Sequence, residues 1–165
     1  MTPREFVKNF FLQAQISEAK TGVPALVILA QAALESGWGN VAPGNMFFGK
    51  KDSDGINGNE QLLLTTEYFD NPDKKFPVTV SIVQVGKKLW KYRVKDWFRK
   101  YNTAEESFTD HGELISKAKR YAGAMAVKHD SYQFATELHK AGYATDPDYT
   151  KKLHPLIKMI SELAK

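Results

Sequence analysis

The segment from Pro24 to Gly39 reads PALVILAQAALESGWG and carries the strongest structural signal in the chain. Its length and its lack of internal breakers predict a helix that begins after the proline and runs to about Ser36. Because the segment is apolar on almost every side, we expect this helix to be buried in the core. Gly37 permits the tight turn that ends it.

Glu35 is the one acidic residue of this apolar segment, and it falls in the last turn of the expected helix. Burial at that position would disfavour the charged form of the carboxyl, and so would the partial negative charge of the helix C-terminus. A glutamic acid kept protonated near neutral pH can donate a proton to a leaving oxygen. A solvated glutamate at a frayed helix end is the alternative interpretation.

Helices are also predicted at both ends of the chain. Thr2-Pro3-Arg4-Glu5 combines an N-cap, a proline at the first helical position and a capping-box glutamate. Thr103 to Glu106 forms a second capping box, and Asp130 to Gln133 starts another helix. Asp146-Pro147 is expected to open the last helix, which Pro155 should kink or interrupt.

The middle of the chain shows the alternation of apolar and polar side chains that is typical of strands. The alternating segments are 62–69, 77–85 and 89–98, with turns at Asn71-Pro72-Asp73 and Gly86-Lys87. They predict a small antiparallel sheet between helices, and therefore an α+β fold. We expect one domain over residues 1–165 with an inserted β-lobe at about 61–99.

The composition is that of an ordinary globular domain, and it excludes some kinds of catalytic chemistry. The chain has 165 residues, 42% of them hydrophobic, and its lack of cysteine excludes disulfides and a thiol nucleophile. Its net charge of +4 gives a weak preference for anionic partners. No histidines have metal-ligand spacing, so we expect them at the surface and expect neither a metal nor a cofactor.

The first five residues lack the basic and apolar regions of a secretory signal. The longest strongly apolar stretch, Val23 to Leu34, is too short to span a bilayer. We therefore expect no membrane insertion. To act at the cell wall without such a signal, the protein would be exported by another route or delivered by a phage, or this chain would be a domain excised from a larger protein.

Ala32 to Gly39, AALESGWG, resembles the catalytic motif of the glucosaminidase family of lysozyme-like enzymes, glycoside hydrolase family 73. That family includes bacterial autolysins, phage lysins and the flagellar rod-cap peptidoglycan hydrolase. Further matching segments, in family order, are FGK at 48–50, TTEY at 65–68, RY at 120–121 and AGYATDPDY at 141–149. The set covers nearly the whole chain and implies a lysozyme-like fold, with a helical lobe and a β-lobe flanking a cleft.

The same resemblance implies catalytic roles for three residues. Glu35 would be the general acid that protonates the bridging oxygen of a β-1,4 bond after N-acetylglucosamine. Glu67 matches the β-lobe glutamate of the family and would act as a base on water or stabilise the oxocarbenium ion. Tyr121 would orient the substrate N-acetyl group or a water molecule through its hydroxyl. An exposed strand glutamate and a core tyrosine are the plainer interpretations of the last two.

Three further residues are candidates for substrate binding. Phe48 and Tyr143 are expected to line the cleft and stack on sugar faces, although aromatic residues are more often part of a core. Asn45 matches a family asparagine imperfectly, because it stands one residue further from the Phe-Gly pair than in the family. Trp38 is expected to be structural. Rival carboxylates in the loops are Asp52, Asp54 and Asp70.

The resemblance predicts a monomeric peptidoglycan hydrolase acting on glycan strands at the bacterial cell wall, in the periplasm or outside the cell. A muramidase, a lytic transglycosylase, or a non-catalytic wall-binding or phage structural module would share the fold. The basic and aromatic run from Lys87 to Lys100 is the best argument for nucleic-acid binding instead, but a nucleic-acid-binding domain would give no reason for the ordered family motifs. In an enzyme this run would hold an anionic wall polymer or line the cleft.

Overall fold

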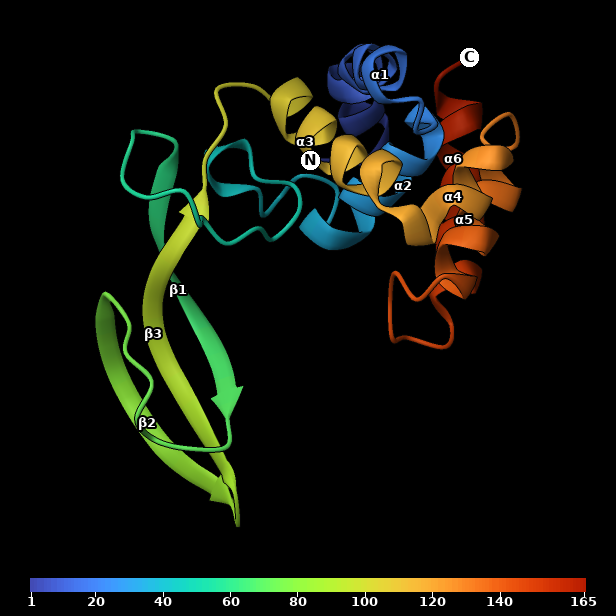
Figure 1. Cartoon of the computed structure of the whole chain (residues 1–165). Helices are drawn as coiled ribbons and strands as arrows, with labels where there is room; N and C mark the ends of the chain where they lie inside the picture. Colours follow the sequence, from blue (N-terminus) through green and yellow to red (C-terminus); the bar gives the residue numbers. More distant parts are fainter. The chain divides into compact units, whose positions relative to one another are not determined.

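The computed structural model describes residues 1–165 as six α-helices, two short 3-10 helices and a three-stranded sheet (Figure 1). The chain forms two compact units, a helical unit of residues 1–48 and 101–165 and a sheet unit of residues 49–100. The α+β class expected from the sequence is confirmed. None of the helices has the combination of length and apolar character that a bilayer span requires.

The helical unit is built from segments on both sides of the sheet unit in the sequence. Its helices are α1 (Pro3–Thr21), α2 (Ala25–Ser36), α3 (Ala104–Lys117), α4 (Ala122–Ala126), α5 (Ser131–Lys140) and α6 (Tyr149–Leu163), with the 3-10 helices η1 (Pro43–Asn45) and η2 (Lys119–Tyr121). The predicted capping box of α1 is present, because Thr2 Oγ1 accepts from Glu5 N at 3.2 Å and Glu5 Oε2 accepts from Thr2 N at 2.7 Å.

Helix α2 lies in the core, as its apolar sequence predicts. Val27, Ile28 and Leu29 are fully buried, and the helix contacts α1, α5 and α6. Gly37 ends it in the left-handed conformation, with φ at 57° and its N–H bonded to the carbonyl of Ala33. The next residue, Trp38, packs edge-on against Phe6 with 5.6 Å between ring centroids, which is the structural role expected for it.

Helix α6 differs from its prediction in two respects. It begins at Tyr149, after the Asp146-Pro147 pair, and it continues through Pro155. Of the two outcomes predicted at this proline, a kink or a break, the break is therefore wrong. Proline removes one backbone hydrogen bond from the helix. The helix stays continuous because its inner face is fully buried against the core.

The remaining local differences concern weak signals. Thr103 Oγ1 accepts from Glu106 N at 3.2 Å, but Glu106 Oε2 accepts from Asn102 N instead of completing the second capping box. The short α4 was not predicted, because its five residues carry no side-chain cap.

The sheet unit contains β1 (Glu60–Phe69), β2 (Val78–Gly86) and β3 (Leu89–Arg99). The spatial order is β1-β3-β2 with both pairs antiparallel, so β3 is the central strand (Figure 1). Tyr92 is fully buried and packs against the rings of Phe69 and Phe76 at 5.1 and 5.7 Å. Its hydroxyl donates to Asn71 O at 2.6 Å and so fixes the connection between β1 and β2.

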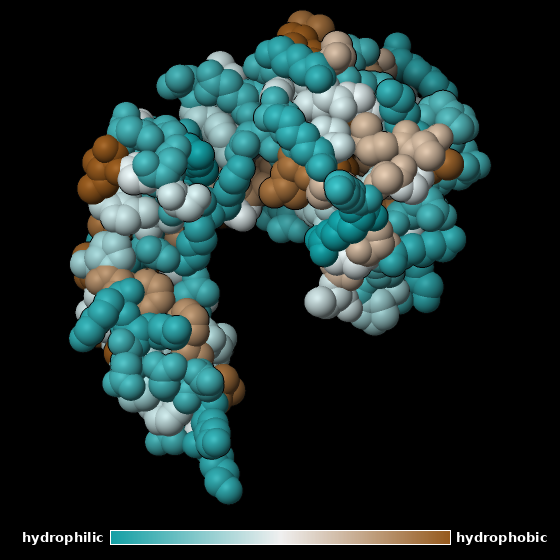
Figure 2. Space-filling view, viewed as in Figure 1, coloured by the Kyte–Doolittle hydropathy of each residue, from teal (hydrophilic) through white to brown (hydrophobic).

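Strand β2 is exposed along its whole length. Val80, Val83 and Val85 are 60%, 53% and 49% exposed. In Figure 2 the sheet accordingly shows tan and brown side chains among teal ones at the surface. The edge of this sheet is therefore not covered by the rest of its own unit.

Helices α1 and α3 pack closely at Gly112. A Cβ atom at this position would lie 2.7 Å from Thr21 Oγ1 and 3.0 Å from Thr21 Cγ2. Thr21 is fixed in place, because its hydroxyl donates to Ser17 O at 2.9 Å and accepts from Val23 N at 3.2 Å. The absence of a side chain at Gly112 is thus what allows the two helices to approach.

We expect Gly112→Ala to lower the free energy of unfolding by about 1–2 kcal/mol. Overpacking costs about 1–3 kcal/mol, which exceeds the gain in helix propensity of up to about 1 kcal/mol. Urea denaturation measures the difference. Gly123→Ala in α4 is the matched control, because its Cβ would meet its nearest neighbour, Glu137 Oε2, at 3.9 Å, and it should be neutral or stabilising. Wild-type stability in Gly112→Ala would contradict the close packing.

Candidate active site

Glu35 lies in the last turn of α2, on the same face as Gln31 one turn earlier. Its side chain is exposed, and its neighbour Leu34 is 37% exposed. The burial of Glu35 expected from the sequence is therefore wrong, because the core covers α2 as far as Ala33 and its last turn emerges on this side. Ser36 Oγ donates to Ala32 O at 2.5 Å and accepts from Gly39 N at 2.8 Å, which fixes the turn that follows.

Two protonated phenols lie within electrostatic reach of Glu35. Burial raises the pKa of Tyr143, and the charges of Tyr149 and Glu35 raise it further. Burial also raises the pKa of Tyr149 despite its hydrogen bond from Gln31, and Glu35 adds to the rise. The two rings are 5.6 Å apart. Both hydroxyls therefore keep their protons at neutral pH and can act as hydrogen-bond donors.

The fully buried Gln31 joins these phenols to α3. Its Nε2 donates to Tyr149 Oη at 2.9 Å, and its Oε1 lies 3.0 Å from His111 Nε2. Because the amide oxygen can only accept, this assignment places a hydrogen on His111 Nε2. Tyr143 Oη lies 3.3 Å from the same nitrogen. A continuous chain of polar groups thus connects α2, α3, α6 and the segment before α6.

His111 corrects one prediction from the sequence. All four histidines were expected at the surface, but His111 is only 8% exposed. Its ring stacks on Phe48 with 3.7 Å between centroids and 12° between planes. The amphipathic pattern of α3 places it on the buried face beside Phe108, where the amide of Gln31 satisfies its nitrogen.

Phe48 is 9% exposed and supports His111 from inside the helical unit. An open ring for sugar stacking, as expected from the sequence, is therefore not present at this position. Asn45 uses its amide within the fold, where Nδ2 donates to Tyr101 O at 3.1 Å and to Asn102 O at 3.2 Å. These bonds join the segment after α2 to the segment before α3.

Tyr121 ends η2 and is 1% exposed. Its hydroxyl accepts a hydrogen bond from Arg120 Nη2, and the Arg120 guanidinium lies 4.5 Å from the centre of the same ring. The Tyr121 and Tyr143 rings are 6.1 Å apart. The ring thus has the packing of a core tyrosine, and the predicted role of its hydroxyl in orienting substrate stays a prediction.

Glu67 lies on β1 opposite Tyr92 of β3, and its side chain is 28% exposed. Its Oε1 lies 2.7 Å from Lys51 Nζ, which also lies 2.5 Å from Asp96 Oδ2. Partial burial lowers the pKa of Lys51, but its hydrogen bonds to Asp96 and Glu67 produce a net rise. Glu67 is therefore held in an ion pair, whereas Glu35 has no cationic partner.

The rival carboxylates have other partners or lie at the surface. Arg99 Nη1 lies 2.9 Å from Asp54 Oδ2, and Arg99 Nε lies 3.5 Å from Asp52 Oδ1. Asp70 is exposed and accepts from Asn71 Nδ2 at 2.8 Å. No group of three or more His, Asp or Glu side chains is arranged to hold a metal ion.

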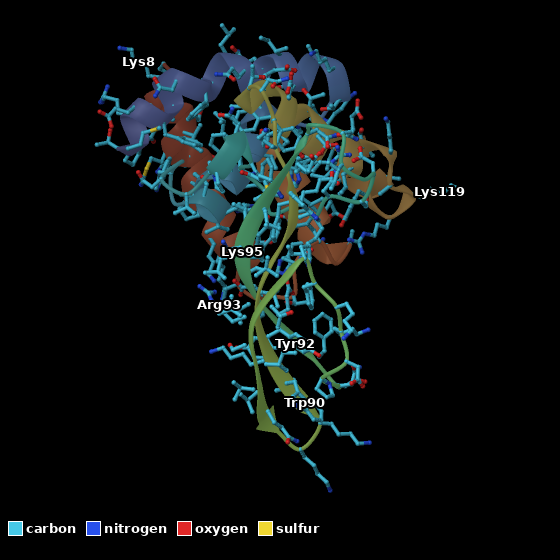
Figure 3. All side chains as sticks on the ribbon, turned by 90° about the vertical axis from the view of Figure 1, so that its left-hand side faces the viewer. Lys8, Trp90, Tyr92, Arg93, Lys95 and Lys119 are labelled. Carbon is cyan, nitrogen blue, oxygen red and sulfur yellow. The ribbon has the colours of Figure 1, made fainter.

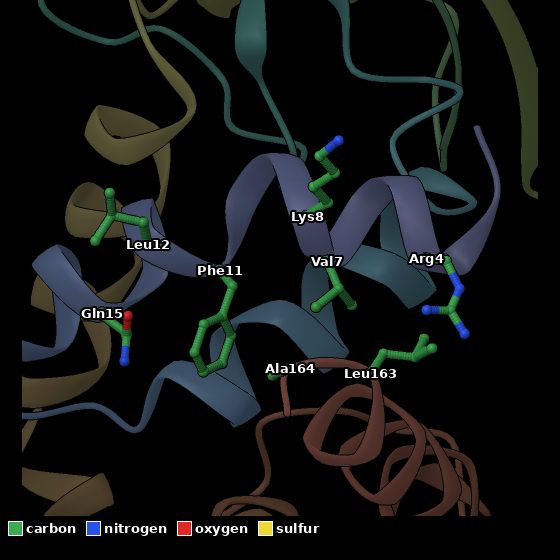
Figure 4. Close-up of a pocket in the computed structure, with 8 residues that line it drawn as sticks. All are labelled: Arg4, Val7, Lys8, Phe11, Leu12, Gln15, Leu163 and Ala164. Atoms are coloured by element: carbon green, nitrogen blue, oxygen red, sulfur yellow. The ribbon is translucent and has the colours of Figure 1, made fainter.

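A pocket on the helical unit is lined by none of these residues (Figure 4). Side chains of α1 and of the end of α6 line it, namely Arg4, Val7, Lys8, Phe11, Leu12, Gln15, Leu163 and Ala164. It contains no acidic side chain and none of the residues expected at the active site. It therefore offers no group for acid catalysis.

Sequence reasoning missed Gln31, His111 and Tyr149 as parts of the site. Gln31 could have been found, because it is the single polar residue between Ala25 and Leu34 and stands four residues before Glu35. On a helix that spacing places both side chains on one face. Tyr149 lies at the end of the matching segment 141–149, where its hydroxyl gave no separate signal.

Comparison with known proteins supports the expected family. A family model described as glucosaminidase, mannosyl-glycoprotein endo-beta-N-acetylglucosaminidase, matches residues 12–162. The peptidoglycan hydrolase FlgJ of Escherichia coli O157:H7 is 34% identical over 168 residues, which cover 98% of this chain and 48% of FlgJ. The autolysin of Enterococcus faecalis is 34% identical over 94% of this chain and 20% of its own length. The chain thus spans about half the length of FlgJ.

Solved structures share the fold. The glycoside hydrolase domain of Salmonella typhimurium FlgJ superposes with a TM-score of 0.72 at 30% identity, covering 99% of this chain and 91% of that domain. The catalytic domain of the autolysin Auto from Listeria monocytogenes gives 0.70 at 26% identity, covering 99% and 87%. The lysozyme-like α+β fold expected from the sequence is confirmed.

We expect Gln31→Leu to lower the free energy of unfolding by about 1–3 kcal/mol, because it removes two buried hydrogen bonds, one to the Tyr149 hydroxyl and one to His111 Nε2. Thermal denaturation measures the loss. Gln15→Leu is the matched control on an exposed position of α1 and should change stability by less than about 0.5 kcal/mol. Equal effects of the two substitutions would contradict the structural role of Gln31.

Proposed function

This chain belongs to the glucosaminidase family of glycoside hydrolases, and we propose that it hydrolyses the β-1,4 bond between N-acetylglucosamine and N-acetylmuramic acid in peptidoglycan. The observation that carries the proposal is the placement of Glu35. It lies at the end of α2 in a segment that matches the family, exposed, without a cation, and near two phenols that keep their protons. The site of action would be the bacterial cell wall, where this substrate occurs.

Glu35 is the proposed general acid. Its exposure lets a glycan reach the carboxyl, and a bound sugar removes the water around it. That loss of water favours the uncharged form, because no cation compensates the carboxylate. The proton then passes to the bridging oxygen as the bond to the anomeric carbon breaks. The acid is thus prepared by substrate binding, in place of the permanent burial expected from the sequence.

Glu67 is the proposed second carboxylate, as a base on water or as a stabiliser of the oxocarbenium ion. Its ion pair with Lys51 supports this assignment, because the ammonium fixes the position of the carboxylate on β1. Asp96, on the other side of Lys51, keeps the lysine in place when Glu67 changes partners. The two proposed catalytic carboxyls therefore differ in their surroundings, since Glu67 has a cation beside it and Glu35 has none.

The tyrosines are proposed to position the substrate. Tyr143 is half-buried and near Glu35, so its protonated hydroxyl can donate to the substrate. The ring of Tyr121 packs against that of Tyr143, with 6.1 Å between centroids. Its hydroxyl would orient the N-acetyl group or a water molecule. If the acetamido oxygen attacks the anomeric carbon, the reaction needs no nucleophile from the enzyme.

The sugar left at the new reducing end distinguishes the related activities. A glucosaminidase leaves N-acetylglucosamine there, a muramidase leaves N-acetylmuramic acid, and a lytic transglycosylase leaves an anhydro sugar without adding water. A non-catalytic wall-binding module gives no new ends. Mass spectrometry of borohydride-reduced muropeptides released from purified walls separates all four. A product other than reduced N-acetylglucosamine would contradict the proposed bond.

Glu35→Gln should lower muropeptide release roughly 10³-fold, because a glutamine cannot donate the proton and general acid catalysis contributes about 10²- to 10⁴-fold. The exposed position predicts unchanged thermal stability. Glu162→Gln is the matched control, since it also changes an exposed glutamate near the end of a helix. Activity within tenfold of wild type in Glu35→Gln would rule out the assignment.

Glu67→Gln should lower the same activity severely, by about 10²-fold, because the amide cannot act as a base or carry the charge. Its oxygen can still accept from Lys51, so the fold should be kept. Asp70→Asn, directly after β1, is the matched control and also tests a rival carboxylate. A small change in Glu67→Gln would contradict its catalytic role and favour the acetamido-assisted route.

A further inference from the structure

The two faces of the sheet carry different chemistry. Successive side chains of a strand point to opposite faces, and residues paired directly across strands share a face. Glu67 pairs with Tyr92, so both lie on the face that holds the small apolar core. Arg93 and Lys95 lie on the other face, and Figure 3 labels them on the opposite side of the β3 ribbon from Tyr92.

That opposite face has a row of cations along its central strand. Lys91, Arg93 and Lys95 alternate with buried residues of β3 and are themselves exposed. Strand geometry spaces them about 7 Å apart. We call these three residues and their cross-strand partners the cationic face. The partners are Thr66, Tyr68 and Leu64 on β1, and Val78, Ser81 and Val83 on β2.

The row is not neutralised by the protein. None of its three cations makes an ion pair, and the one hydrogen bond is from Arg93 Nη1 to Thr66 Oγ1 at 2.9 Å. By contrast, Lys51 on the Glu67 face is paired with two carboxylates. Like charges repel one another, and no carboxylate of the sheet unit forms an ion pair with any of these three.

Charge is also segregated along the sequence. Residues 74–95 contain seven Lys and Arg and no Asp or Glu, although the chain as a whole has 23 basic and 19 acidic residues. Without this segment the chain would be net acidic. The basic character of the protein is therefore concentrated in β2, β3 and their connections, which gives a local field for anions.

We propose that the cationic face binds an extended phosphodiester polymer with a polyol backbone, lying along β3. The cations form a line, which matches a linear polyanion, and phosphates linked through a three-carbon unit repeat at a similar interval. The aliphatic side chains on both sides, such as Leu64 and Val83, can pack against the polyol carbons. This surface does not depend on the proposed catalytic reaction.

Two other anionic partners fit less well. Insertion into a lipid surface requires apolar side chains that reach deeper than the cations, whereas here Lys and Arg are longer than the flanking Val and Leu. Single-stranded nucleic acid is bound through several stacking aromatic rings. On this face Tyr68 is 55% exposed, and the other aromatic residue, Trp97, is half-buried.

The position of the cationic face has a consequence for the enzyme. Because it lies on the opposite side of the sheet from Glu67, a polymer bound there leaves the proposed catalytic carboxylate open. The polymer and a glycan strand can thus be bound at the same time. Binding of the polymer would hold the protein in the wall between cleavage events and raise its local concentration there.

The test uses the full chain and fluorescently labelled poly(glycerol phosphate), with the dissociation constant measured by anisotropy at several salt concentrations. The variant Lys91→Gln/Arg93→Gln/Lys95→Gln should bind at least about tenfold more weakly. The slope of log Kd against log salt should fall by about 2. The variant would neutralise three fewer phosphates, and each contributes about 0.7 to the slope. Muropeptide release from walls stripped of anionic polymer should stay at the wild-type level.

The matched control is Lys8→Gln/Lys119→Gln/Lys158→Gln, which removes the same charge from exposed positions of the helical unit. Figure 3 labels Lys8 and Lys119. The control variant should keep wild-type affinity for the polymer. If both variants bound equally weakly, the loss of affinity would come from net charge alone, and the proposal would be overturned. Circular dichroism and thermal denaturation verify the fold of each variant. Tighter binding to phosphatidylglycerol vesicles, or to a single-stranded oligonucleotide of equal charge, would also overturn it.

Discussion

A single buried amide fixes the geometry of the helical unit around Glu35. An amide transferred from water into an apolar core without partners costs several kcal/mol, so Gln31 must find its partners on other elements. It finds them in Tyr149 and His111, which belong to α6 and α3. Both elements are thereby held in one position relative to α2. Because Glu35 follows one turn later on the same face, its place beside the two phenols depends on that bond pattern.

The two proposed catalytic carboxyls differ in the charged groups around them. Glu35 has neutral phenols near it and no cation, so any loss of water acts on it without compensation. Glu67 shares Lys51 with Asp96, and a lysine between two carboxylates stays charged when one of them is engaged elsewhere. Glycoside hydrolysis uses one carboxyl as the acid and a second as a base or stabiliser, and the different neighbours of these two residues suit that division.

Local sequence signals made most of the helices and strands predictable, but they did not predict which side chains are exposed. The capping box at Thr2 and the stop at Gly37 depend on neighbouring residues only, and both are present. Strand alternation likewise placed Glu67 and Tyr92 correctly on the sheet. The burial of His111 follows the amphipathic pattern of α3, but a histidine is a weak signal for a core position. The exposure of Glu35 depends on which element covers the last turn of α2, and the sequence pattern of one helix contains no such information. Pro155 stays helical for the same reason, since partners far away in the sequence hold it.

The period of two residues in a strand allows one sheet to carry two functions. Every second residue of β3 belongs to the face with Glu67, and the residues between them carry the cationic row. The two sets can change independently, because substitution on one face leaves the packing of the other intact. The register must stay fixed, since a shift of β3 by one residue would turn its cations toward the face of Glu67 and its apolar residues toward solvent. Tyr92 resists such a shift, because its ring is enclosed by Phe69 and Phe76 and its hydroxyl is bonded to Asn71. The same buried tyrosine therefore preserves both the ion pair of Glu67 and the alignment of the cationic row.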